Sequence, residues 1–260
     1  MRALSMLLAV LATGVLATSA HASSGTNFSD QWWNPNESGW GASISQQADV
    51  MYVELYVYGP DSRPTWYSGA LYFQPSSGRL LFTGDLNVYS GPWFGGSFNP
   101  AFVSSRKVGT IAFEASSTDT ATLTYSVDGR TYVKDIERQL WAYEDFNGSY
   151  YGGFVYEQSS CSNPDSNGHV EELGSIDINQ TSNNTFTLTL ESSFGTCTIT
   201  GPYSQLGHMG RVDASYACSY AVNGTLTLYE LERTDAGMTG RFVATNNVCD
   251  VAGTLGGVRR

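Results

Sequence analysis

Residues 120–138 read TATLTYSVDGRTYVKDIER, and this stretch contains the clearest local signature of the fold. Apolar and small polar residues alternate through its first half, which is the two-residue period of a strand with one buried face. Asp128-Gly129 then provides the two positions of positive φ that a type I′ turn requires. We therefore predict a β-hairpin whose strands cover 120–127 and 130–138.

The same alternation continues on both sides of this hairpin. Segment 51–58 alternates aliphatic residues with tyrosines and a glutamate, which predicts a buried face and an outer face. In the second half, Phe186, Leu188 and Leu190 interleave with threonines. We count eight strands in this half, at 149–156, 174–179, 185–192, 196–203, 211–218, 224–232, 238–245 and 249–258.

The spacing of these segments predicts the fold class. Short strands at regular intervals, without a helical stretch, indicate an all-β protein with two antiparallel β-barrel or β-sandwich domains. Asn223-Gly224 is a hairpin turn signal, and we expect a turn there. Similar glycine-rich segments at 148–154 and 253–258 suit a sheet whose first and last strands meet.

Two residue types divide the chain at the same place. All six Trp lie before residue 142, whereas all four Cys lie after residue 160. We place the domain boundary at 145, in a polar stretch ahead of Asn147-Gly148. The expected organisation is a signal peptide at 1–22, a tryptophan-rich β domain at 23–145 and a disulfide-containing antiparallel β domain at 146–260.

The first residues have the pattern of a secretory signal. Arg2 provides a positive charge, 4–17 form an apolar segment too short to span a bilayer, and Ala20-His21-Ala22 fits the cleavage rule. We predict cleavage after Ala22 and a periplasmic or extracellular protein. No later segment reaches about 18 consecutive apolar residues, so no transmembrane helix is expected in the mature chain.

The charge balance restricts the partners. The chain has 13 Lys and Arg against 24 Asp and Glu, a formal net charge of −11. Phosphate binding needs a basic surface, so nucleic acid is not an expected partner. A polybasic patch for an anionic membrane is absent as well. No feature of the sequence indicates an oligomeric state.

The four cysteines are expected to form two disulfides, because the chain is predicted to be exported. Three pairings exist, and the strand order selects among them. If the fourth and fifth strands of the second half form a hairpin, Cys197 lies opposite Cys218. If the first and last strands are neighbours, Cys161 and Cys249 can meet. We therefore predict Cys197–Cys218 and Cys161–Cys249, and no metal site, since no C-x-x-C spacing occurs.

A search for catalytic motifs leaves few candidates. His169 and His208, the histidines beyond the signal peptide, adjoin glycines and are expected to be solvated loop residues. Nucleophile elbows, zinc motifs, phosphate loops and dinucleotide fingerprints are absent, so no cofactor is expected. Glycoside hydrolysis needs only two carboxyl groups close in space, which leaves Glu37 and Asp85 as candidates for a hydrolase.

Aromatic clusters are the strongest functional feature of the first half. Aromatic faces stack on sugar rings, while amide and carboxylate groups hydrogen-bond their edges. The candidate ligand-binding residues are Trp33, Glu37, Trp40, Trp66 and Trp93. The alternative interpretation is that these rings fill a core, because large aromatic side chains are usually buried.

The segment from Trp32 to Gly41, WWNPNESGWG, resembles a module of many exported proteobacterial proteins of uncharacterised function. The likeness covers most of 30–140, and the second half looks like a companion domain that contains the cysteines. Ala48 and Ser62 depart from the pattern, because related modules tend to have glycine there. The resemblance implies kinship and export, and no particular reaction.

These observations favour a non-catalytic binding or envelope-associated module that recognises a glycan or polymer through aromatic residues. The first alternative is a hydrolase that uses Glu37 or Asp85. The second is a structural or protein-interaction module. An aromatic platform without a convergent carboxylate pair would distinguish binding from hydrolysis.

Overall fold

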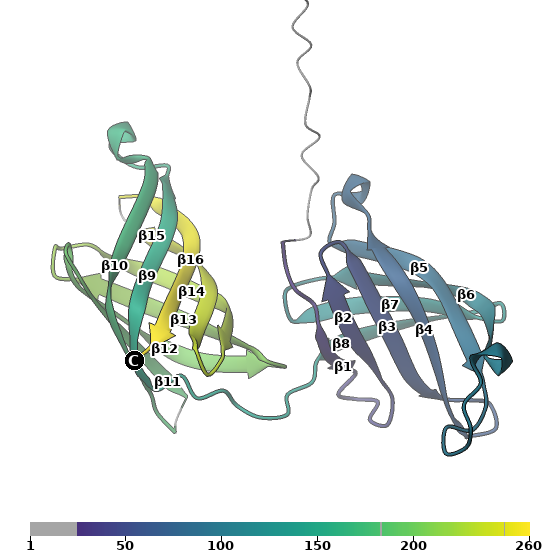
Figure 1. Ribbon diagram of the computed structural model, residues 1–260. Coiled ribbons are helices and arrows are strands. Elements are labelled where there is room, and N and C mark those ends of the chain that lie inside the picture. The colour runs from purple at the N-terminus through teal and green to yellow at the C-terminus, as the bar shows by residue number, and fades with distance from the viewer. Residues whose placement is uncertain (1–24, 183, 247) are drawn as a thin grey trace, which may run out of the picture.

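The computed structural model describes residues 25–182, 184–246 and 248–260, so the expected signal peptide at 1–22 lies outside the described residues. The chain forms two closed antiparallel barrels of eight strands each, joined by the segment 139–147 (Figure 1). The all-β prediction is confirmed, and both sheets close as barrels. Among the described residues, no helix is long and apolar enough to cross a membrane.

In the first barrel every strand pairs with the next one along the chain, and β8 returns to pair with β1. Its strands are β1 (Asp30–Trp33), β2 (Gly41–Gln47), β3 (Val50–Tyr58), β4 (Pro64–Phe73), β5 (Leu81–Ser90), β6 (Ser104–Ala115), β7 (Thr120–Val127) and β8 (Arg130–Arg138). The predicted hairpin is confirmed as β7 and β8. Its turn residues Asp128 and Gly129 have φ values of 47° and 82°, as a type I′ turn requires.

The second barrel repeats this order and contains both disulfides. Its strands are β9 (Gly148–Ser159), β10 (Gly168–Gln180), β11 (Thr185–Ser192), β12 (Gly195–Leu206), β13 (Met209–Cys218), β14 (Asn223–Arg233), β15 (Gly237–Asn246) and β16 (Asp250–Arg259). The first and last strands meet, because β16 pairs with β9 along ten register positions. Cys197 lies opposite Cys218 in the β12–β13 ladder and is bonded to it, and Cys161 is bonded to Cys249, as predicted.

The turn predicted at Asn223-Gly224 is wrong. Both residues belong to β14, where Asn223 pairs with Ala217 and Gly224 pairs with Tyr216. A Cβ on Gly224 would clash with the carbonyl oxygen of Thr245, so this glycine permits the close approach of β15. The chain reverses earlier, around Ala221, whose φ is 65°.

Each barrel is filled at one end by a phenylalanine that precedes its first strand. In the first barrel this residue is Phe28, which is fully buried. Its backbone N–H donates to Gln46 Oε1 at 2.9 Å, and its carbonyl accepts from Trp32 Nε1 at 3.0 Å. The backbone N–H of Gln46 in turn donates to Ser29 Oγ at 2.8 Å.

The second barrel repeats this arrangement around Phe146, which is also fully buried. Its N–H donates to Gln180 Oε1 at 3.0 Å, and its carbonyl accepts from Tyr150 Oη at 2.8 Å. The N–H of Gln180 donates to Asn147 Oδ1 at 2.6 Å. In both barrels the partners occupy equivalent positions, so the two halves share one structural plan.

The turn between β12 and β13 of the second barrel contacts the first barrel. The backbone N–H of His208 donates to Asp30 at 3.2 Å, and His208 Nδ1 lies 2.7 Å from the same oxygen. Arg138, fully buried in the first barrel, donates to Asp30 at 3.1 Å. The expectation of a solvated His208 is therefore wrong, because its turn packs on the other barrel. His169 is exposed but belongs to β10, beside Glu157.

Candidate functional site

The outer surface of β3 and β4 carries large aromatic side chains. Because side chains alternate along a strand, the residues between the buried positions of β3 point to solvent. Tyr52 and Tyr56 of β3 are 43% and 48% exposed, and Trp66 and Tyr72 of β4 are 54% and 56% exposed. We call these four residues the aromatic face.

The pairing of β3 with β4 determines how the four rings are arranged. Tyr56 lies directly opposite Trp66, so their side chains are neighbours on the same side of the sheet. Tyr72 lies opposite Val50, six residues from Tyr56 along β3. At about 3.3 Å per residue, the two ends of the aromatic face are ~20 Å apart. The face is therefore an open strip, a shape that suits an extended ligand.

A row of polar side chains crosses the aromatic face between its ends. Ser43, Glu54 and Ser68 are register partners on β2, β3 and β4, and Ser68 is buried. The hydroxyl of Tyr52 lies 2.8 Å from Ser68 Oγ, and Tyr56 Oη donates to Glu54 at 3.3 Å. Burial, and then the charge of Glu54, raises the pKa of Tyr56, so its phenol stays protonated. Among the described residues, no basic side chain lies within ion-pair distance of Glu54.

The loop between β1 and β2 holds two of the predicted site residues, Glu37 and Trp40. Gly41 pairs with Tyr56 on the outer side of the sheet, so Trp40, one residue earlier, faces the other side and packs against the core of the first barrel. Glu37 accepts from Lys134 Nζ at 2.6 Å and from Trp40 Nε1 at 3.0 Å. The hydrogen bond from Lys134 lowers the pKa of Glu37. A carboxylate held ionised in this way is poorly suited to act as the general acid of a hydrolase.

The remaining predicted residues do not converge with Glu37. Asp85 lies on β5 and pairs with Lys107 at 2.6 Å. Trp33 is half-buried, and its Nε1 is buried without a hydrogen-bond partner. Trp93 is 73% exposed on the loop between β5 and β6. Of the five predicted residues, Trp66 alone belongs to the aromatic face.

The three tyrosines of the aromatic face were not among the predicted site residues. For Tyr52 and Tyr56 a signal was present, because both occupy outer positions of the alternating segment 51–58. Only the pairing of Tyr56 with Trp66 shows that rings far apart in sequence form one surface. The hypothesis that the tryptophans fill a core holds for Trp32, which is 1% exposed.

The described residues contain no group of three or more His, Cys, Asp or Glu side chains arranged to hold a metal ion. The chain matches no protein-family model, and no curated protein matches its sequence. The site must therefore be interpreted from its own geometry and chemistry.

Proposed function

We propose that this is an exported, non-catalytic protein that binds a glycan or a similar polyhydroxylated polymer on the aromatic face. The observation that carries the proposal is the exposed pair formed by Tyr56 and Trp66, with the polar row of Glu54 beside it. Rings stack on the apolar faces of sugars, and the carboxylate accepts hydrogen bonds from sugar hydroxyls. The open strip favours a polymeric ligand over a small molecule, because small molecules are usually held in a concave pocket.

Export is supported by the two disulfides of the second barrel, because such bonds persist in oxidising compartments. The acidic net charge of −11 disfavours nucleic acid as the extended ligand. The contacts of Glu37 and Asp85 with lysines argue against the hydrolase alternative. A measured turnover that disappears in Glu37→Gln would reinstate that alternative.

Affinity electrophoresis through gels that contain soluble polysaccharides tests the proposal. The full chain should be retarded by at least one neutral or cationic polysaccharide. The double variant Tyr56→Ala/Trp66→Ala should lose the retardation. Trp141→Ala is the matched control, because Trp141 is 73% exposed on the segment between the barrels and outside the aromatic face. Equal retardation of the double variant and the control would contradict the proposal.

A further inference from the structure

The second barrel is hollow at the end that carries its disulfides. A cavity of about 120 Å³ lies there, whereas Phe146 fills the opposite end. The apolar part of its wall comes from Phe154, Leu190, Ile199, Leu226, Phe242 and Val251. Tyr220 also lines the cavity and is 42% exposed, so the wall reaches the solvent at this point. This cavity lies in a different barrel from the aromatic face.

A buried glutamate interrupts this apolar wall. Glu172 of β10 is 5% exposed and points inward in phase with Ile176 and Ile178. The next residue, Leu173, is 56% exposed on the outside of the barrel. The usual pattern of apolar inside and polar outside is thus reversed at these two positions. A buried carboxylate is unfavourable unless a partner compensates it, so the reversal points to a binding role.

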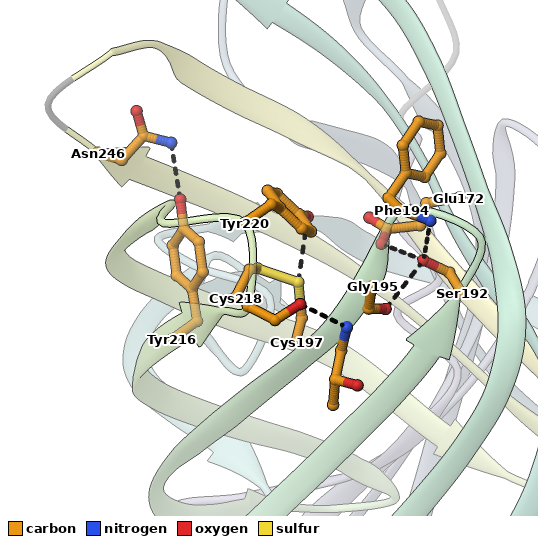
Figure 2. Close-up of a disulfide and its surroundings, with 11 residues drawn as sticks. Glu172, Ser192, Phe194, Gly195, Cys197, Tyr216, Cys218, Tyr220 and Asn246 are labelled. Atoms are coloured by element: carbon orange, nitrogen blue, oxygen red, sulfur yellow. Dashed lines mark hydrogen bonds between the residues drawn. A yellow bond between two sulfur atoms is a disulfide. The ribbon is translucent and has the colours of Figure 1, made fainter.

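Figure 2 shows the hydrogen bond that Glu172 makes in the cavity wall. Ser192 Oγ donates to Glu172 Oε1 at 2.7 Å, and the same serine oxygen accepts from the N–H of Phe194 at 3.2 Å. No lysine, arginine or histidine of the described residues lies within ion-pair distance of Glu172. The carboxylate therefore has a hydroxyl partner and no protein cation.

Three tyrosines complete the polar part of the cavity. Asn246 Nδ2 donates to Tyr216 Oη at 2.8 Å, and Tyr220 Oη lies 3.1 Å from Cys197 Sγ, which fixes these rings near the disulfide (Figure 2). Burial, and then the charge of Glu172, raises the pKa of both Tyr156 and Tyr220 to about 12. The phenols are therefore neutral, and both experience the negative potential of the carboxylate.

We propose that this cavity binds a small apolar amine, with its ammonium group against Glu172 and its hydrocarbon body against the apolar wall. An ammonium ion supplies the charge that Glu172 lacks, and aromatic rings attract cations through their faces. A neutral ligand would leave the carboxylate uncompensated, and an anionic ligand would be repelled by it. The cavity volume restricts the ligand to a compact molecule, such as an amine with a single ring.

Calorimetric titration of the full chain tests this proposal with three probes of one shape: 2-phenylethylamine, 2-phenylethanol and phenylacetate. The amine should bind at least tenfold more tightly than the alcohol, and phenylacetate should not bind. Equal affinity for the amine and the alcohol in the wild-type protein, or no binding of the amine at millimolar concentration, would overturn the proposal. This comparison needs no variant to fold.

Two variants locate the binding. Glu172→Gln keeps the shape of the side chain and should weaken amine binding at least tenfold, without weakening the alcohol. Glu171→Gln is the matched control, because Glu171 is the adjacent residue on the outside of the barrel, 63% exposed beside His169. Glu171→Gln should bind the amine as the wild type does. If both variants bind the amine equally, the carboxylate in the cavity is not the site.

Discussion

The contact between His208 and Asp30 predicts how the stability of the protein varies with pH. Hydrogen bonds to Asp30 and then to Glu232 raise the pKa of His208 from 6.5 to about 9. A group whose pKa is raised by folding contributes stability that is fully present below its unfolded pKa and is lost as the pH rises through its folded pKa. This contribution should therefore be complete below about pH 6.5 and disappear above about pH 9.

The size of the His208 contribution to stability follows from the same contact. A rise from 6.5 to about 9 corresponds to about 3 kcal/mol, at 1.36 kcal/mol for each pKa unit. The His208 side chain is 39% exposed, and solvent screening of a partly exposed pair reduces this to ~1–2 kcal/mol. Burial acts to raise the pKa of Asp30, but hydrogen bonds from His208 and Gln31 lower it overall. The Asp30 contribution is therefore lost at the acidic side, as the pH falls below about 4.

Urea denaturation of the full chain at pH 6 and pH 9.5 measures this effect. Tryptophan emission reports on the first barrel and the following segment, because all six Trp lie before residue 142. The wild-type protein should lose ~1–2 kcal/mol more than His208→Gln between the two pH values, since the variant lacks the titrating group. An equal loss in both proteins would refute the argument that this contact links the barrels.

Two further predictions concern stability. Replacing both cysteines of Cys161–Cys249 by serine should cost about 4.6 kcal/mol, against about 3.3 kcal/mol for Cys197–Cys218, because the bridged segments span 88 and 21 residues. Denaturation curves of the two variants that show the opposite order would contradict this expectation. Ala48→Gly should stabilise the first barrel by up to ~1 kcal/mol, because Ala48 has a φ of 50° that glycine adopts without steric cost. A lower thermal midpoint for that variant would count against this explanation.

Local sequence patterns were sufficient to predict much of the fold. Asp128-Gly129 formed the predicted turn, and the two alternating segments beside it pair in unbroken register from Val127–Arg130 to Thr120–Glu137. The pairing of the cysteines could be predicted from strand order alone, since Cys197 lies opposite Cys218 in the register of one hairpin. Asn223-Gly224 carries a similar turn signal but forms a strand, because β15 approaches too closely for any other residue at 224.

The candidate sites depended on contacts that a local sequence pattern does not contain. His208 meets Asp30 across 178 residues of sequence, so its role could not be inferred from the glycine beside it. The aromatic face needs the register of β3 with β4, which brings Trp66 opposite Tyr56. Glu172 was missed because the predicted strand began at 174, whereas β10 begins at Gly168 and directs this carboxylate inward.

The affinity of the aromatic face for a sugar chain tests the proposed function most directly. Calorimetric titration with an oligosaccharide cut from the polysaccharide that retards the wild-type protein compares Trp66→Ala with Trp141→Ala. Stacking of one ring on an aromatic side chain contributes ~1–3 kcal/mol by analogy with other stacking platforms. Trp66→Ala should weaken binding about tenfold or more, with an unchanged thermal midpoint, and Trp141→Ala should bind as the wild type does. Wild-type affinity in Trp66→Ala, or equal weakening in both variants, would contradict it.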